Sequence, residues 1–206
     1  METKKKTKIL AVSDIHADSS LAKKLAKKAK EENVDLIILA GDITWLDQPM
    51  KNVIAPFEKL KKEILLLPGN HEPLSTINTL TEIYTGTKNL HGYSIRKGDL
   101  GIFGAGYDSA MGPFWINDEE IFRTLKNSHE KIKNAKKKIM VTHTPPSGTK
   151  MEMLGFEGSE AVERAIKKFK PNIVISGHIH EFGGIVDYLH GAKTINVARN
   201  AAIFEI

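Results

Sequence analysis

The 206-residue chain contains no cysteine. This absence excludes a disulfide framework and any metal site built from thiolate ligands. It is also typical of proteins that stay in a reducing compartment, so we expect this chain to be cytoplasmic.

Long apolar runs are absent as well. The basic residues 4–6 are followed by an apolar run of only residues 9–12, whereas a signal peptide needs about 7–15 apolar residues. No run approaches the roughly 20 apolar residues that a membrane-spanning helix requires. The sequence therefore predicts no membrane partner.

Acidic residues are outnumbered by basic ones, and the formal net charge is +5. Such an excess can indicate a nucleic-acid partner, because phosphates attract lysine and arginine. Many of these lysines, however, lie on predicted helices, as in residues 23–30, where they would form a solvated face. Residues 136–138 are all lysine, but no aromatic residue is interleaved with them. We find no strong nucleic-acid signal, and the sequence leaves open whether the chain forms a homo-oligomer.

Length and composition indicate a single domain over residues 1–206. With 41% hydrophobic and 27% charged residues, the composition is that of an ordinary soluble globular protein. A chain of this length can bury a substantial core. We find no internal repeat, low-complexity segment or linker that would divide it.

Five apolar runs of strand length each end in histidine, aspartate or asparagine. The runs are residues 8–13, 36–40, 64–68, 138–142 and 172–176, and the polar residues that follow them are Asp14, His16, Asp42, Asn70, His71, His143, His178 and His180. In an open α/β sheet the carboxyl ends of the strands line one crevice, where ligands bind. The sequence therefore predicts a binding site built from these side chains.

Two pairs of these residues share a spacing of two. Asp14 and His16 form one pair, and His178 and His180 form the other. In an extended chain, residues two apart lie on the same side, so each pair could face one ion.

Each of the remaining residues has an ordinary explanation when taken alone. Asp42 could cap a helix, Asn70 could form a turn, and His143 could be a satisfied loop histidine. These explanations combine poorly, because five of the eight histidines fall at strand ends beside aspartate or asparagine. The other histidines, for which we expect structural roles, are His91, His129 and His190.

Between the apolar runs, the pattern predicts helices over residues 19–32, 49–61, 76–84, 117–135 and 159–170. Ser19 or Ser20 is the expected N-cap of the first helix. Short strands are predicted over residues 93–96 and 101–103, and antiparallel strands over residues 183–206 with turns near His190 and Arg199. The glycine-rich residues 104–115 are expected to form the rim of the site with the aromatic side chains of Tyr107, Phe114 and Trp115.

Taken in order, the motifs Asp-x-His, Gly-Asp, Gly-Asn-His-Glu, His and Gly-His-x-His resemble those of the calcineurin-like metallophosphoesterase superfamily. The match is to its small single-domain archaeal and bacterial phosphoesterases. The resemblance implies an α/β fold, namely a four-layer αββα sandwich of two mixed β-sheets flanked by helices. It also implies two divalent metal ions. Asp14, His16 and His180 would hold one ion, Asn70, His143 and His178 the other, and Asp42 would bridge them.

Nitrogen and oxygen ligands without sulfur suit Mn, Fe, Zn, Ni or Co, and we expect Mn. Two such ions clamp the attacking and leaving oxygens of an in-line displacement. The resemblance implies hydrolysis of a phosphoester by a metal-bridging hydroxide, with Asp42 as the bridge and His71 as the general acid. Glu72, which follows His71, is expected to orient it.

Two departures from the superfamily bear on the substrate. Its protein phosphatases carry Asp-Arg-Gly shortly after the bridging aspartate, but residues 43–47 contain no arginine. We also see no appended domain like the DNA-capping domain of its repair nucleases. We therefore expect a small phosphodiester or phosphomonoester substrate. The alternatives are a nuclease on single-stranded nucleic acid and a non-catalytic metal-binding scaffold of the same fold.

Overall fold

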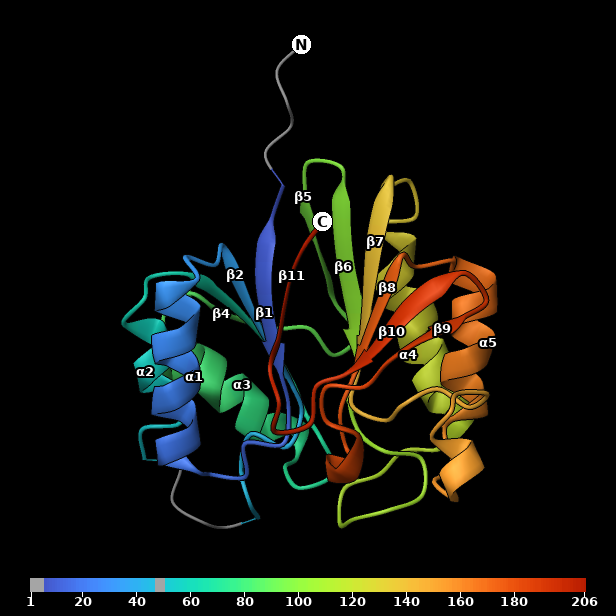
Figure 1. Cartoon of the computed structure of the whole chain (residues 1–206), viewed down its shortest axis with the longest axis horizontal. Helices are drawn as coiled ribbons and strands as arrows, with labels where there is room; N and C mark the ends of the chain where they lie inside the picture. The colour runs from blue at the N-terminus through green and yellow to red at the C-terminus, as the bar shows by residue number, and fades with distance from the viewer. Residues whose placement is uncertain (1–5, 47–50) are drawn as a thin grey trace.

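The computed structural model describes residues 6–46 and 51–206. Within them the apolar runs form strands of two sheets that pack face to face (Figure 1). The first sheet has the order β11-β1-β2-β3-β4, and the second has the order β5-β6-β7-β8-β10-β9. The strands are β1 (Lys8–Val12), β2 (Leu36–Ala40), β3 (Glu63–Leu67), β4 (Thr87–Asn89), β5 (Ser94–Lys97), β6 (Leu100–Ala105), β7 (Lys137–Thr142), β8 (Ile173–Ser176), β9 (Val186–Leu189), β10 (Ala192–Asn196) and β11 (Ala202–Glu205).

Both sheets are mixed. In the first sheet β1 to β4 run parallel, whereas β11 pairs antiparallel with β1. In the second sheet β6, β7, β8 and β10 are parallel, whereas the edge strands β5 and β9 are antiparallel to their neighbours. The predicted fold class is confirmed. The five runs do not share one open sheet, however, because β1, β2 and β3 belong to the first sheet and β7 and β8 to the second.

Helices cover the outer face of each sheet and complete the four layers (Figure 1). The first sheet carries α1 (Ser19–Glu31), α2 (Ala55–Glu58) and α3 (Leu74–Ile83), and the second carries α4 (Asp118–Glu130) and α5 (Glu160–Phe169). Two short 3₁₀ helices are η1 (Glu152–Leu154) and η2 (His180–Phe182). Among the helices of the described residues, none is long and apolar enough to cross a membrane.

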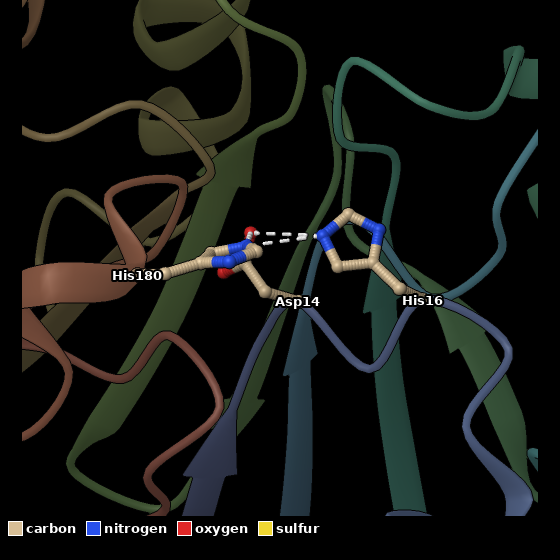
Figure 2. Close-up of side chains that lie close together, drawn as sticks. All are labelled: Asp14, His16 and His180. Atoms are coloured by element: carbon tan, nitrogen blue, oxygen red, sulfur yellow. Dashed lines mark hydrogen bonds and ion pairs between the residues drawn. The ribbon is translucent and has the colours of Figure 1, made fainter.

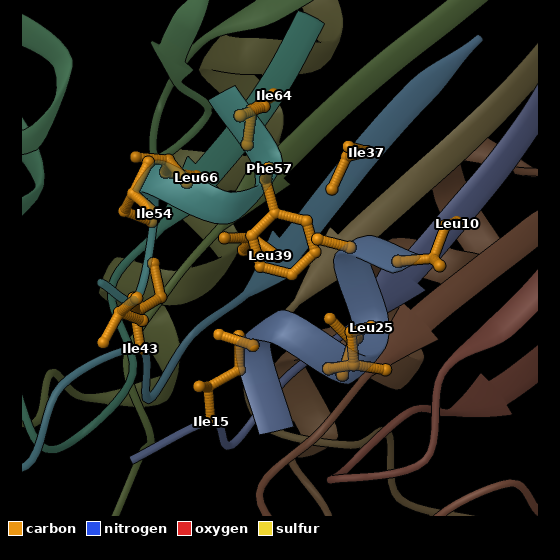
Figure 3. Close-up of a cluster of buried hydrophobic side chains, with 14 of the residues drawn as sticks. Leu10, Ile15, Leu25, Ile37, Leu39, Ile43, Ile54, Phe57, Ile64 and Leu66 are labelled. Atoms are coloured by element: carbon orange, nitrogen blue, oxygen red, sulfur yellow. The ribbon is translucent and has the colours of Figure 1, made fainter. Parts of the chain in front are cut away.

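Alternation along the strands divides the apolar side chains among three cores. On β1, Leu10 and Val12 face the helices, whereas Ile9 and Ala11 face the second sheet. Because both faces of the strand are buried, its apolar run is continuous rather than alternating. Figure 3 shows the helix-facing core of the first sheet, in which Phe57 of α2 lies among strand side chains.

Three helix predictions need correction. Asp18 caps α1 in place of Ser19 or Ser20, since its Oδ1 accepts hydrogen bonds from two backbone N–H groups of the first turn. The helix predicted to reach residue 135 ends at Glu130. The helix predicted over residues 49–61 is reduced to the single turn of α2, and its first two residues lie outside the described part of the chain.

The shortness of α2 has a backbone cause. Asn52 and Lys61, on either side of it, have φ angles of 62° and 54°, which a right-handed helix does not allow. The apolar spacing of this region reflects burial of Val53, Ile54 and Phe57 rather than a long helix.

The prediction of antiparallel strands over residues 183–206 is correct in part. β9 and β10 form the predicted hairpin around His190. The second predicted antiparallel turn, near Arg199, is wrong because β10 and β11 do not pair with each other. β10 pairs parallel with β8, and β11 crosses to the first sheet, where it pairs with β1. The three-residue strand β4 was not predicted, since it is too short for a periodic pattern.

Candidate metal centre

The loops that follow β1, β2, β3, β7 and β8 converge, so that side chains from both sheets meet. They bring together all seven residues predicted as metal ligands, in two groups with one carboxylate between them. The first group is Asp14, His16 and His180, the second is Asn70, His143 and His178, and Asp42 lies next to both.

Figure 2 shows the first group. The Nε2 atoms of His16 and His180 lie 3.1 Å apart, and His180 Nε2 lies 3.3 Å from Oδ1 of Asp14. His16 Nε2 is 3.8 Å from the same oxygen. Imidazole nitrogens bind a divalent ion such as zinc at about 2.0–2.1 Å, which places two of them on one ion roughly 3 Å apart. The three atoms are therefore spaced as ligands of a common ion are.

The second group converges on the amide oxygen of Asn70. This Oδ1 lies 2.9 Å from Nε2 of His143 and 3.0 Å from Nδ1 of His178. The opposite nitrogen of His143, Nδ1, donates a hydrogen bond of 3.0 Å to the carbonyl oxygen of Ala40. Because a carbonyl can only accept, this bond directs Nε2, which could bind a metal ion, toward the group.

Asp42 connects the two groups. Its Oδ2 lies 3.4 Å from Nε2 of His143 and 3.7 Å from Nε2 of His16. Its Oδ1 accepts a hydrogen bond of 3.0 Å from the backbone N–H of His71, which fixes the carboxylate. One oxygen of Asp42 thus faces a histidine from each group, which is the position that a bridging ligand needs.

The charges of the centre suit cations. Burial would raise the pKa of Asp42, but His143 and His16 outweigh it and hold this pKa well below its usual range. Burial would lower the pKa of His143, yet Asp42 and Asp14 raise it to about 10. A proton on His143 therefore offsets part of the negative charge of two buried carboxylates. A divalent ion would take over this function, so the donor set fits metal binding in both chemistry and charge.

Left-handed backbone, rather than an extended chain, directs the side chains of several predicted ligands. Asp14, His16, Asp42 and His178 have φ angles of 59°, 48°, 49° and 71°. Such angles are uncommon outside glycine, are most frequent in Asn, Asp and His, and cluster at functional sites. The expectation that spacing by two would place each pair on one side of an extended chain is therefore wrong. His178 and His180 accordingly turn to different groups.

Backbone contacts between the loops hold these turns. The N–H of Asp14 donates to the carbonyl of Gly41 at 3.0 Å, and that of His16 donates to the carbonyl of Asp42 at 2.9 Å. A side chain at Gly69 would overlap the carboxylate of Asp42, so the β3 loop can approach the β2 loop only with glycine there. The loops after β1, β2 and β3 therefore pack against one another as one unit.

His71 lies at the edge of the centre. Its Nε2 is 3.8 Å from Oδ2 of Asp42, and its side chain is 19% exposed. The indole of Trp45 stacks on the ring with centroids 4.4 Å apart and an interplanar angle of 15°. The same indole meets the ring of His16 edge-on at 4.6 Å. His71 is thus held by an aromatic face and remains accessible from outside.

Glu72 does not orient His71 as expected. The Nδ1 atom of His71 is buried without a hydrogen-bond partner among the described residues. The carboxylate of Glu72 instead accepts from the backbone N–H groups of Ile43, Thr44 and Gly69, at 3.2, 3.1 and 2.9 Å. Burial, followed by the charge of Asp42, raises the pKa of Glu72 to about 7. Glu72 therefore connects the loop after β2 to the loop after β3 through these hydrogen bonds.

Replacing Glu72 with alanine is expected to destabilise the metal-free protein by about 3 kcal/mol or more, since three buried N–H groups each lose an acceptor at roughly 1–3 kcal/mol. Urea unfolding measures the change. Glu82→Ala, which removes an exposed carboxylate of α3, serves as the control and should shift stability by about 0.5 kcal/mol at most. Equal stabilities of the two variants would contradict this interpretation.

The remaining histidines lie outside both groups. His91 accepts a hydrogen bond of 3.0 Å from the backbone N–H of Gly106. His129 stacks on the ring of Phe169, and His190 lies 2.8 Å from a carboxylate oxygen of Glu163. These contacts agree with the structural roles expected for the three.

Trp45 and Asp108 lie near the centre and were not predicted as site residues. Trp45 belongs to the loop after β2, and nothing in its spacing distinguishes it from a packing residue. Asp108 follows β6, and its carboxylate lies 3.6 Å from Nε2 of His178. The only available signal was that β6, like the five runs, is an apolar strand followed within a few residues by an aspartate.

Comparison with known proteins agrees with the fold. The protein TT1561 of Thermus thermophilus matches with a TM-score of 0.77 and 16% identity, over 97% of this chain and 99% of that one. A dimetal phosphatase from Danio rerio gives a TM-score of 0.62 and 13% identity, over 92% and 86% of the two chains. Phosphopantetheinyl hydrolase from Mycobacterium tuberculosis gives 0.61 and 14%, over 94% and 89%. At these identities the likeness shows the fold alone.

The search of curated proteins finds no match. The sequence model of the family described as calcineurin-like phosphoesterase, however, matches residues 7–182. This span includes all seven converging residues predicted as ligands, as well as His71. The chain therefore belongs to the calcineurin-like phosphoesterase family.

Proposed function

We propose that this chain, as a single domain, is a dimetal-dependent phosphoesterase that hydrolyses a small phosphodiester or phosphomonoester. The observation that carries the proposal is the position of Asp42. Its Oδ2 lies within 3.8 Å of imidazole nitrogens from the first group, the second group and His71. Asp42 as the bridging ligand and His71 as the proton donor would thus lie next to each other.

The ligand groups would hold the two ions separately, with Asp42 shared. When bound, the ions would supply a nucleophilic hydroxide near neutral pH and stabilise the charge of the transferring phosphoryl group. The ligands offer imidazole, carboxylate and amide oxygen, which suit Mn, Fe, Zn, Ni or Co, and we propose Mn. Asp14 and Asp42 are the two carboxylates, so two dications would leave the centre positive and attractive to phosphate.

His71 is proposed as the general acid. Its backbone N–H donates to Asp42, and Trp45 covers one face of its ring, so that its position is set from two sides. The partly exposed ring can reach a leaving oxygen and give it a proton. Such a positioned acid contributes about 10²–10⁴-fold in rate.

Aromatic side chains support a substrate with a flat group. Trp115 is 58% exposed and Trp45 is 39% exposed. The loop that carries Trp115 is bound to the centre, because the N–H of Phe114 donates to the carbonyl of Asn70 at 3.2 Å. Tyr107, also predicted for this rim, packs instead on His91 with centroids 5.2 Å apart. We therefore propose Trp115 and Trp45, rather than Tyr107, as stacking surfaces.

One observation favours the nuclease alternative, namely a groove lined by lysines. A hollow of about 620 Å³ between α1 and α2 is lined by Lys23, Lys27, Lys30, Lys59 and Lys62. Among the described residues that line it, none belongs to the metal centre and none is an aromatic residue that could stack a base. We therefore favour a small substrate over a polynucleotide.

We expect hydrolysis of bis-nitrophenyl phosphate to change little between low and high salt, and single-stranded DNA to be the poorer substrate. Binding through several phosphates would instead weaken steeply with salt. The variant Lys23→Gln/Lys30→Gln should leave hydrolysis unchanged, since both side chains lie in the groove. DNA cleavage that is far faster than ester hydrolysis, and that collapses with salt and in this variant, would show the nuclease alternative to be right.

A panel of substrates tests the proposed function directly. Protein loaded with Mn would be assayed against a phosphomonoester, a phosphodiester and a cyclic nucleotide, with Asp42→Ala as the inactive control. We expect turnover of at least one small ester and none by the control. Metal binding without turnover of any member would favour the scaffold alternative.

A further inference from the structure

A buried carboxylate outside the predicted ligand set faces the second ligand group. Asp108 is 4% exposed, and its Oδ2 lies 3.6 Å from Nε2 of His178. On the same ring, Nδ1 lies 3.0 Å from Oδ1 of Asn70. The ring of His178 therefore stands between the candidate ion site and Asp108.

We propose that Asp108 is a positioning residue for the second metal ion, because it holds the ring of His178 with Nδ1 turned toward that ion. The inference rests on the proposed function, since it requires His178 to ligate metal. Histidine ligands usually donate their other ring N–H to a carboxylate or a carbonyl, which fixes the ring and strengthens the ligand. His143 of the same group has this arrangement with the carbonyl of Ala40.

The side of the His178 ring that carries Nε2 faces Asp108. In the described part of the chain, Nε2 of His178 is buried and has no hydrogen-bond partner. The 3.6 Å distance to Asp108 is slightly longer than a hydrogen bond of about 2.7–3.2 Å. A negative charge at this distance favours the ring orientation that points N–H toward it.

Asp108 is itself held in place by the loop that contains it. Its Oδ1 accepts hydrogen bonds from the backbone N–H groups of Ala110 and Met111, at 2.9 and 2.8 Å. The same loop is fastened to the second ligand group by the hydrogen bond from Phe114 to Asn70. Oδ1 thus shapes the loop and Oδ2 faces His178, and the hydroxyl of Thr144 also donates a hydrogen bond to this carboxylate.

Because the two oxygens of Asp108 make different contacts, one substitution can change the contact with His178 and keep the loop. Asp108→Asn can keep the acceptor that shapes the loop while replacing Oδ2 with an amide group that donates rather than accepts. Asp187→Asn is the matched control, because Asp187 also accepts from two backbone N–H groups, of Lys150 and Tyr188. It lies outside both ligand groups.

Calorimetric titration of the metal-free protein with Mn²⁺ measures the effect, with the melting temperature as a check of folding. We expect the wild type and Asp187→Asn to bind two ions, and Asp108→Asn to bind one ion normally and the other about 10–100-fold more weakly. Asp108→Glu, which restores the carboxylate, should recover part of this affinity. In a His178→Ala background, Asp108→Asn should have no further effect.

The outcomes separate this inference from the proposed function. A wild type that binds no metal would overturn the proposed function itself. Two normal ions in Asp108→Asn would overturn only the positioning inference. Equal weakening of both ions, or a loss that persists in the His178→Ala background, would also overturn it, because Asp108 would then act through the loop and not through His178.

Discussion

Replacement of Asp42 by alanine is expected to remove metal binding and hydrolysis together. Asp42 is 2% exposed, and its Oδ2 lies close to an imidazole nitrogen of each group, 3.7 Å from His16 and 3.4 Å from His143. Without it, each proposed ion would lose a ligand, and the centre would lose one of its two carboxylates, Asp14 and Asp42. Activity should fall by at least the roughly 10²–10³-fold that follows loss of a single electrostatic stabiliser.

Elemental analysis after Mn loading and desalting, together with hydrolysis of bis-nitrophenyl phosphate, measures both effects. Asp42→Asn is the matched variant, since its side-chain oxygen can still accept from the N–H of His71 while its charge is gone. We expect both variants to lose metal. An Asp42→Asn protein with two ions and near-normal activity would show that the residue only supports the β3 loop.

Replacement of His71 by alanine is expected to lower activity by about 10²–10⁴-fold while the metal content stays at two ions. The loss should be smaller for bis-nitrophenyl phosphate than for an alkyl ester, because nitrophenolate leaves without needing a proton. His190→Ala, a histidine substitution outside the centre, serves as the control and should leave activity unchanged.

The structure makes this test necessary. His71 lies close enough to His16 and Asp42 for these three residues to form a metal site of their own. If His71 were a ligand, its removal would lower metal content together with activity, and the loss would be similar for good and poor leaving groups. That result would make His71 a metal ligand rather than the general acid.

The location of the centre could be predicted because the apolar runs are read directly from the sequence. A run buried on both faces ends where polar residues begin, and the loop after each such strand carries the predicted ligands. The division into two sheets could not be predicted in this way. Leu10 packs on helices and Ile9 on the other sheet, yet both read as members of one continuous run.

Side-chain direction was the weaker part of the prediction. Asp14 and His16 meet through left-handed turns, and Glu72 points away from its neighbour His71 toward backbone N–H groups of the loops. Asp108 was missed because its sequence context is that of an ordinary turn, and its contact with His178 joins residues far apart in the sequence. Such pairings depend on tertiary packing, which local periodicity does not encode.

Restoring activity to metal-free protein with measured amounts of Mn²⁺ tests the central claim most directly. Hydrolysis of bis-nitrophenyl phosphate would be followed as Mn²⁺ is added to protein stripped with chelator. We predict no activity without metal, a rise that saturates at two ions per chain, and reversal by excess chelator. Activity that is independent of metal, or that is complete at one ion per chain, would contradict a dimetal phosphoesterase.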